Sequence, residues 1–265
     1  MRITTWNVNS VRQRLEHLEQ FLQTAAPDVL CLQEIKCMDE AFPAARIEAL
    51  GYNVAVHGQK TFNGVALLSR FPLEDVRRGL PGDETDEQSR YIEAVISVNG
   101  GAVRVASIYL PNGNPLGTEK FSYKLAWMER LGRHMAASVA AEETAIFAGD
   151  YNVIPEPRDA KDPAAWLGDA LFQPESRALY QGFQNLGLTD ALRACHDSSG
   201  LYTFWDYQAG AFQRDFGIRI DHALLTPRAA DLLRDAIIHK ETRAWQKPSD
   251  HAPLSIDLEI APRAA

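Results

Sequence analysis

The chain has 265 residues, of which 46% are hydrophobic and 23% are charged, and its formal net charge at pH 7 is −8. These values are ordinary for a globular chain that buries a large core, and they exclude a disordered polar segment. The negative charge argues against nonspecific binding of polyanions, although a local basic rim is compatible with it.

Hydropathy and cysteine usage indicate the compartment. No apolar run approaches the roughly 20 residues needed to span a membrane, and the N-terminus continues directly into a strand pattern without a signal peptide. The three cysteines, Cys31, Cys37 and Cys195, have no CxxC spacing and cannot all pair with one another. We therefore expect a cytoplasmic protein with reduced thiols and no membrane contact.

Short apolar runs bounded by turn residues predict a series of β-strands. In chain order they cover residues 3–6, 29–32, 54–56, 65–68, 91–98, 103–110, 144–148, 218–225 and 254–260. The Asn99-Gly100-Gly101 segment is typical of a hairpin turn between two of them.

Apolar residues at helical spacing predict three helices between the strands. The first follows Ser10, a good N-cap, and the others lie near residues 121–135 and 179–186. Residues 156–176 form the longest irregular stretch, and loops of that length are usually functional or disordered. No linker or repeat divides the chain, so we expect one domain over residues 1–265. Mixed sheets with helices outside, an α/β (α+β) architecture, fit this order best.

Polar side chains stand where apolar strands stop. Asn7 and Glu34 follow early strands, Tyr109 and Asp150 follow two later ones, and Asp250-His251 precedes the last. Each has an ordinary structural interpretation as a turn, cap or solvated residue. Together, however, oxygen ligands without a cysteine cluster favour a hard cation such as Mg²⁺ or Mn²⁺. A nearby histidine adds a group that titrates near neutral pH, and the combination predicts metal-assisted phosphoryl transfer.

Seven motifs in register resemble the exonuclease III family of apurinic/apyrimidinic (AP) endonucleases, within the endonuclease/exonuclease/phosphatase superfamily. They are Trp6-Asn7-Val8-Asn9, Gln33-Glu34-Ile35-Lys36, Asn63-Gly64-Val65-Ala66, Tyr109-Leu110-Pro111-Asn112-Gly113, Gly149-Asp150-Tyr151-Asn152, Arg219-Ile220-Asp221 and Ser249-Asp250-His251. The resemblance covers residues 2–260. It implies a four-layer sandwich of two packed mixed β-sheets flanked by helices, and a single catalytic domain.

The resemblance also implies roles for individual residues. Glu34 is the main metal ligand with Asn7 beside it, and Asp250 lies near the metal. Asp150 aligns and deprotonates the attacking water with help from Asn152. His251 hydrogen-bonds the scissile phosphate, Asp221 orients its imidazole, and Tyr109 contacts the phosphate.

Substrate contacts are implied in the same way. Asn112 contacts phosphate or positions the substrate. The pocket for the abasic sugar is expected from Phe204, Trp205, Ile218 and Ile220. Cations in or near the motif loops are candidates for phosphate contacts, with a solvated surface cation as the equal alternative for each: Lys36, Lys60, Arg90, Lys120 and Lys124.

Two positions depart from the family pattern. Asn9 stands where some relatives have Asp, which lowers the number of carboxylates near the metal and leaves one or two metal ions open. Tyr151 stands where Phe is common, and this exchange of aromatic residues is expected to be harmless.

The resemblance predicts a monomeric, Mg²⁺-dependent DNA repair nuclease, for which Mn²⁺ can substitute. Its substrate is double-stranded DNA with abasic sites or 3′ ends. It cuts 5′ to abasic sites and acts also as a 3′–5′ exonuclease or 3′-phosphodiesterase. One alternative is another metal-dependent phosphodiesterase or phosphatase of the superfamily. A second is a catalytically silent nucleic-acid-binding member, against which the complete set of acidic residues and His251 argues.

Overall fold

Alternating side chains on the central strands build the layers of the molecule. In the computed structural model, which describes residues 1–261, strand β2 (Val29–Gln33) places Val29 and Cys31 in the core between two sheets. Its Leu30 and Leu32 face the opposite way, into a second core beneath helices. Because both faces are buried, the strand is apolar at nearly every position.

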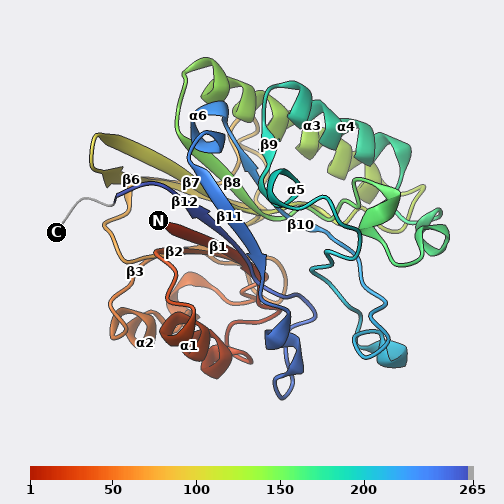
Figure 1. Ribbon diagram of the computed structural model, residues 1–265, viewed down its shortest axis with the longest axis horizontal. Helices are drawn as coiled ribbons and strands as arrows, with labels where there is room; N and C mark the ends of the chain where they lie inside the picture. The colour runs from red at the N-terminus through yellow and green to blue at the C-terminus, as the bar shows by residue number, and fades with distance from the viewer. Residues whose placement is uncertain (262–265) are drawn as a thin grey trace.

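Two six-stranded sheets pack face to face (Figure 1). The first sheet has the order β11–β12–β1–β2–β4–β3 and consists of β2 with β1 (Arg2–Asn7), β3 (Asn53–His57), β4 (Val65–Ser69), β11 (Leu233–Ile238) and β12 (Leu254–Leu258). The second has the order β5–β6–β7–β8–β10–β9 and consists of β5 (Glu74–Arg78), β6 (Tyr91–Val98), β7 (Gly101–Tyr109), β8 (Ala145–Asp150), β9 (Thr189–Asp190) and β10 (Asp221–Leu225).

Helices cover the outer face of each sheet, which completes the expected four-layer sandwich (Figure 1). Helices α1 (Leu15–Thr24) and α2 (Ala44–Glu48) lie on the first sheet. Helices α3 (Glu119–Ala140) and α4 (Pro174–Asn185) lie on the second. The shorter α5 (Ala191–Cys195) contacts β10 and β11, and α6 (Pro227–Ala230) contacts β10; Ala191, Leu192 and Ala229 from these helices join the core between the sheets.

The sequence-based boundaries hold for most strands and fail at three kinds of place. Ser10 is not the cap of the first helix: its φ is 86°, and α1 begins only at Leu15. The strand expected over 218–225 begins at Asp221, because Ile218 instead forms isolated bridges with Ala160 and Phe204. Strands β5, β9 and β11 were not expected, since β5 and β11 are rich in charged residues and β9 has two residues.

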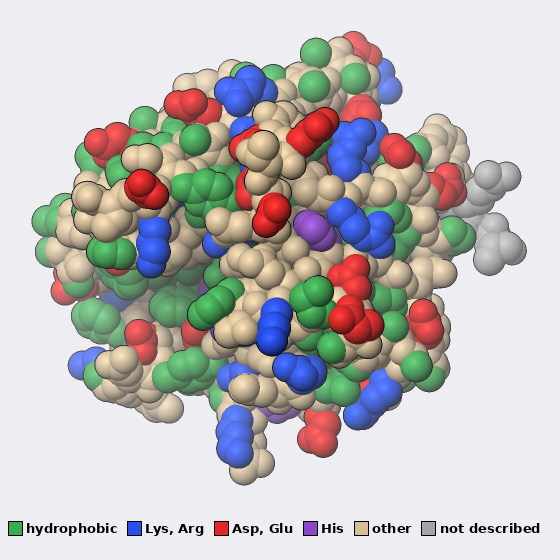
Figure 2. All heavy atoms as spheres, turned by 180° about the vertical axis from the view of Figure 1, so that it is seen from behind, with side chains coloured by type: hydrophobic (Ala, Val, Ile, Leu, Met, Phe, Trp, Pro, Cys, Tyr) green, Lys and Arg blue, Asp and Glu red, His purple; other side chains and the backbone are tan. Residues whose placement is uncertain are grey.

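No helix within residues 1–261 combines the length and the hydropathy that a membrane span requires. On the face opposite to that of Figure 1, acidic and basic side chains are interspersed (Figure 2). This face therefore presents no broad patch of one charge.

Two parallel strand pairs bring the candidate site residues to one edge of the sandwich. β1 runs parallel to β2, with Asn7 opposite Gln33, and β7 runs parallel to β8, with Tyr109 opposite Asp150. The antiparallel neighbour β10 then sets Asp221 opposite Asp150. The carboxyl ends of parallel strands therefore meet at one edge, where scaffolds of this kind hold functional groups.

Close packing of β8 against β7 predicts the effect of one substitution. A methyl group on Gly149 would lie 2.0 Å from the carbonyl oxygen of Ile108, so Gly149→Ala must push the two strands apart. We expect Gly149→Ala to lower the free energy of unfolding by about 3 kcal/mol or more. Denaturant unfolding followed by circular dichroism measures this.

Gly182→Ala in α4 is the matched control, because nothing lies within 4 Å of the added methyl group. It should leave the stability unchanged or raise it by about 0.5–1 kcal/mol. Equal effects of the two substitutions would show that the close approach at Gly149 is not a packing constraint.

Candidate active site

The amide of Asn7 joins the ends of the two sheets. Its Nδ2 donates to Glu34 Oε1 at 2.8 Å and to Asp150 Oδ2 at 2.9 Å, and the Asn7 side chain is fully buried. Glu34 also forms an ion pair with Lys36 at 2.8 Å. Two carboxylates from different sheets are thereby held on one neutral donor.

The backbone around these carboxylates is held in an unfavourable conformation. Glu34 has φ of 51° and Asn152 has φ of 48°, a region that non-glycine residues occupy at a cost of about 1–3 kcal/mol. Hydrogen bonds hold both turns: Ser10 N–H donates to the Glu34 carbonyl at 2.8 Å, and Asn152 N–H donates to Asp150 Oδ1 at 2.9 Å. Strain of this kind aims the side chains rather than stabilising the fold.

His251 and Asp221 form a buried pair. His251 Nδ1 lies 2.8 Å from Asp221 Oδ2, and both side chains are almost inaccessible to solvent. Burial alone would lower the pKa of the imidazole, but the carboxylates of Asp221 and Asp150 outweigh it and raise the pKa to about 10. His251 is therefore an imidazolium at neutral pH, and its Nε2 points toward Asp150 Oδ2 at 3.8 Å.

Asp150 lies at the centre of the cluster and is 1% exposed. Burial raises its pKa to about 7; the His251 imidazolium opposes this rise, whereas the charges of Asp221 and Glu34 add to it. Such a carboxylate accepts a proton near neutral pH, as a general base must.

The donor set fits a hard divalent cation. Among residues 1–261, Glu34, Asp150 and His251 place one potential ligand atom each within 4.8 Å of one another. Because His251 is charged and engaged with Asp221, the potential ligands are the carboxylate oxygens, and such oxygens suit a hard cation such as Mg²⁺ or Mn²⁺. Asp221 Oδ1 is buried without a hydrogen-bond partner in the described chain, so the cluster carries negative charge that its own donors do not satisfy.

Two other residues expected near the metal, Asn7 and Asp250, do not present an oxygen atom to the cluster of Glu34, Asp150 and His251. Asn7 turns its amide nitrogen toward the carboxylates, while its Oδ1 accepts from Asn9 N–H, so the amide would have to turn over before Asn7 held a cation. Asp250 lies outside the cluster of Glu34, Asp150 and His251, and its Oδ1 accepts from Asn9 Nδ2 at 3.0 Å. Asn9 thus connects the two regions.

The predicted phosphate-facing residues line the same edge. Tyr109 is half-buried, and burial together with the charges of Glu34 and Asp150 raises its pKa well above 10, so its hydroxyl remains a donor. Asn152 Nδ2 donates to the Leu110 carbonyl at 2.9 Å, and Asn112 Nδ2 donates to Asn152 Oδ1 at 3.1 Å. Asn112 itself is exposed.

The candidate cations occupy different environments. Lys60 and Lys120 are exposed, Lys36 lies against Glu34, and the Arg90 guanidinium lies 5.0 Å from the centre of the Tyr109 ring. Lys124 cannot contact DNA as expected, because it is fully buried. Its ammonium donates to the carbonyls of Asn112, at 3.1 Å, and Asn152, at 2.5 Å, and burial lowers its pKa to about 7.

The expected pocket residues divide into two groups. Phe204, Ile218 and Ile220 share one cluster, and the Phe204 ring lies 5.0 Å from the His251 ring. Trp205 belongs to a separate cluster with Tyr202 and is fully buried there, so its ring is not part of the wall that Phe204 forms. Adjacent residues of an extended segment point to opposite sides, which explains the division.

Several residues that support the site were not expected from the sequence. Thr203 Oγ1 accepts from the backbone N–H of Asp221 at 3.1 Å, and Ser249 Oγ donates to the Asn7 carbonyl at 2.7 Å. Arg243, in the 3₁₀ turn Lys240–Ala244, donates to the carbonyls of Ser249 and Trp205. Ser249 adjoins Asp250-His251 and was within reach of the motif, whereas no sequence signal marks Arg243.

This geometry combines a carboxylate cluster that could hold a metal ion, a carboxylate with a pKa near neutral pH and a fixed imidazolium, a combination suited to phosphoester hydrolysis. Comparison with known proteins agrees. The model of the endonuclease/exonuclease/phosphatase family matches residues 4–251. Exodeoxyribonuclease III of Haemophilus influenzae is 36% identical over 262 residues, covering 96% of this chain and 98% of that protein.

Solved structures give the same answer. A 3′ phosphatase from Neisseria, NExo, bound to a product DNA hairpin, is 39% identical with a TM-score of 0.93 and covers 98% of this chain and 99% of its own. An AP endonuclease from Archaeoglobus fulgidus is 38% identical with a TM-score of 0.92, again covering 98% and 99%. The chain therefore belongs to the endonuclease/exonuclease/phosphatase family, as a DNA-hydrolysing relative of exodeoxyribonuclease III.

Proposed function

We propose that this protein is a Mg²⁺-dependent DNA repair nuclease, with Mn²⁺ as a substitute, that cuts the phosphodiester 5′ to abasic sites and hydrolyses 3′ termini. The observation that supports this most is the buried contact of Glu34 and Asp150 with one amide, beside the imidazolium of His251. Binding alone gains nothing from an acid with a pKa of about 7 in the company of a fixed cation.

Asp150 is the base in this proposal. It removes a proton from the water that attacks phosphorus, and the Asn152 side chain, 3.1 Å from Asn112, orients that water. Asn152 N–H donates to Asp150 Oδ1 and Asn7 Nδ2 donates to Oδ2, and because each carboxylate oxygen has a second lone pair, Asp150 can still accept the proton of the water. His251 Nε2 donates to the phosphate oxygen on which negative charge grows.

Asp221 acts through His251. Its bond to Nδ1 fixes the tautomer and the ring plane, so the proton on Nε2 points at the phosphate. Tyr109 donates a second hydrogen bond to the phosphate, since its raised pKa keeps the hydroxyl protonated. A Mg²⁺ ion held by Glu34, with Asp150, Asn7 and Asp250 nearby, would neutralise charge on the phosphate.

The packing around Ile218 and Ile220 favours 3′-end hydrolysis as a substantial second activity. These side chains are 2% and 3% exposed, because Leu171 and Phe172 pack with them in the same cluster. A pocket for an abasic sugar needs an open apolar wall, whereas a 3′ terminus can reach the site without one. Structures of a 3′ phosphatase and an AP endonuclease are comparably similar to this chain, which supports testing both activities.

We further propose that residues 1–265 act as one catalytic domain in a cytoplasmic monomer. The three free cysteines support a reducing compartment. Duplex DNA with abasic sites or 3′ ends would be held by Lys36, Lys60, Arg90 and Lys120, and Phe204 would lie against the sugar next to the scissile phosphate.

One set of assays tests the proposed function. A duplex with one abasic analogue, a duplex with a 3′-phosphate and an intact recessed duplex are incubated with Mg²⁺, Mn²⁺ or EDTA. We expect the first two to be cleaved with either metal and not in EDTA. Cleavage that persists in EDTA, or removal of the 3′-phosphate without any cut in the abasic duplex, would contradict the proposal.

Glu34 generates the first prediction of this section. Glu34→Gln keeps the size of the side chain but removes its charge, so the concentration of Mg²⁺ for half-maximal cleavage should rise by about tenfold or more. DNA affinity measured in EDTA should stay within about twofold. An unchanged Mg²⁺ midpoint would remove Glu34 from the metal site.

The pair Asp221–His251 generates the second. Asp221→Asn should leave the fold intact and lower single-turnover cleavage by about 10²–10⁴-fold, because the imidazole loses its fixed orientation and charge. His251→Asn should cost a similar factor, and the double variant little more, since the two groups act as a unit. Losses that multiply in the double-mutant cycle would show that the residues act separately.

Lys124 generates the third. Lys124→Met keeps the buried volume but leaves the carbonyls of Asn112 and Asn152 without their donor. We expect kcat to fall about tenfold with little change in KM for DNA, because Asn152 acts on the attacking water. The exposed Lys120→Met is the control and should change KM alone. A raised KM without loss of kcat in Lys124→Met would favour a direct DNA contact instead.

A further inference from the structure

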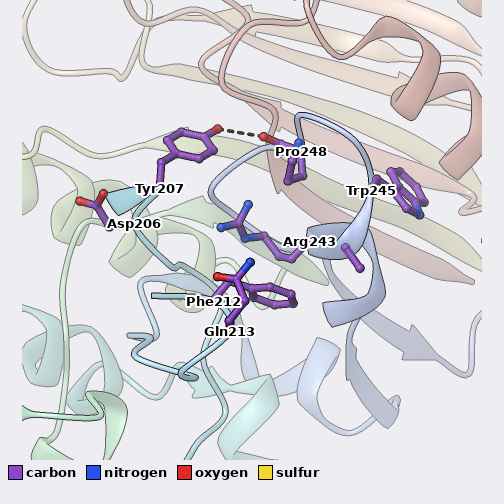
Figure 3. A pocket seen from close by; sticks show the side chains of 8 residues that line it. Asp206, Tyr207, Phe212, Gln213, Arg243, Trp245 and Pro248 are labelled. Atoms are coloured by element: carbon purple, nitrogen blue, oxygen red, sulfur yellow. Dashed lines mark hydrogen bonds between the residues drawn. The ribbon is translucent and has the colours of Figure 1, made fainter. Parts of the chain in front are cut away.

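A pocket of about 440 Å³ lies beside the proposed catalytic centre and takes no part in the mechanism above (Figure 3). It lies between the segment that follows Trp205 and the 3₁₀ turn Lys240–Ala244. The residues that line it are Asp206, Tyr207, Phe212, Gln213, Arg243, Ala244, Trp245 and Pro248. Its volume falls in the range of about 300–1,000 Å³ typical of small-ligand sites.

Arg243 supplies a buried donor to this pocket. The side chain is 5% exposed, and its two outer nitrogens donate to the carbonyls of Ser249 and Trp205. Its Nε–H, in contrast, is buried without a hydrogen-bond partner among the described residues. A buried donor is destabilising unless a ligand or water satisfies it. Other arginines share this state, but Arg243 also lines a pocket of this size.

Aromatic rings surround that donor. The Arg243 guanidinium lies 5.2 Å from the centre of the Phe212 ring and 5.6 Å from that of Tyr207, and Figure 3 shows it between these two side chains. Tyr207 is 52% exposed, and the indole of Trp245 lies farther along the pocket. Two polar side chains, Asp206 and Gln213, complete the lining.

The pocket shares its rim with the catalytic centre. The Tyr207 hydroxyl donates to the Pro248 carbonyl at 2.9 Å and accepts from Asn9 Nδ2 at 3.2 Å. Asn9 Nδ2 also donates to Asp250 Oδ1, next to His251 in the chain. The mouth of the pocket therefore lies next to the segment that carries Asp250 and His251.

We propose that the pocket binds an unstacked nucleobase of the DNA substrate, next to the nucleotide whose phosphate is attacked. A base has two flat faces for the aromatic rings, a ring nitrogen or carbonyl for the Arg243 Nε–H, and amino groups for Asp206 and Gln213. A phosphate fits poorly, because the outer nitrogens of Arg243 are already engaged and Asp206 repels an anion. This inference rests on the proposed function, since it assumes that DNA is the substrate.

Fluorescence of 2-aminopurine tests the proposal without cleavage. The analogue is placed at successive positions around a 3′ terminus or an abasic analogue, and binding is followed in EDTA. We expect one position at which binding of the wild-type protein changes the emission strongly, because the base leaves the DNA stack and packs on Phe212. Phe212→Ala should abolish most of that change and weaken binding about tenfold.

Two further variants separate the pocket from the fold. Gln213→Trp, at an exposed position on the rim, should block the pocket with its own ring and reproduce the loss without disturbing the core. Phe216→Ala removes a 41% exposed ring of the same segment that does not line the pocket, and should leave the signal unchanged.

The outcomes distinguish this inference from the function it rests on. Metal-dependent cleavage with no position-specific signal, or with a signal that Phe212→Ala and Gln213→Trp do not alter, overturns the nucleobase pocket and leaves the nuclease function standing. Failure to bind or cleave DNA overturns both.

Discussion

Electrostatic repulsion among the clustered carboxylates is the constraint on which the properties of the candidate site depend. Glu34, Asp150 and Asp221 come from three strand ends in two sheets, and they converge on a region that solvent barely reaches. Within the described chain their donors are few and include the Asn7 amide, the Asn152 N–H, the Lys36 ammonium and the imidazolium of His251. Burying charges of one sign is costly unless they are paired, so the site favours the arrival of a cation and of the protons that hydrolysis releases.

The scaffold makes this arrangement possible by rigidity. Asp150 is fixed because β8 lies between β7 and β10, and Gly149 permits the close approach of β7. Glu34 occupies a left-handed backbone conformation that is costly for its residue type, Asn152 occupies one that asparagine tolerates better, and the surrounding hydrogen bonds hold both there. The packing of the two sheets therefore fixes the side chains at this edge before a substrate binds. Such preorganisation is what electrostatic catalysis requires.

Much of this was predictable from the sequence, for a physical reason. Apolar strands that end abruptly in Asn7, Glu34 or Asp150 carry a local signal, and motifs in register extend that signal to the whole chain. The resemblance also implied that Asp221 orients the imidazole of His251, and the structure places Asp221 Oδ2 2.8 Å from His251 Nδ1, although residues 218–220 lie outside strand β10.

What the sequence did not reveal depends on long-range packing. Lys124 resembles any surface cation on a helix until α3 is packed on its sheet and the loops of Asn112 and Asn152 close over it. Trp205 and Phe204 are adjacent in the chain, yet only the structure shows that they belong to different clusters. Serine is a common helix N-cap, but the Ser10 N–H donates to the Glu34 carbonyl, and its own carbonyl accepts from the N–H of Arg14, one residue before α1. The burial, the cluster and the hydrogen bonds of these residues depend on neighbours that lie far away in the sequence.

Thermal unfolding of the wild-type protein and of Asp150→Asn, at pH 8 in EDTA and in Mg²⁺, tests the central claim most directly. Burial raises the pKa of Asp150 from 3.8 to about 7, so the stability that its protonated form provides is lost as pH rises through about 7. The account predicts that Mg²⁺ raises the Tm of the wild type, that Asp150→Asn is more stable than the wild type in EDTA, and that the variant gains less from Mg²⁺. A wild type indifferent to Mg²⁺, together with a variant destabilised in EDTA, would contradict it.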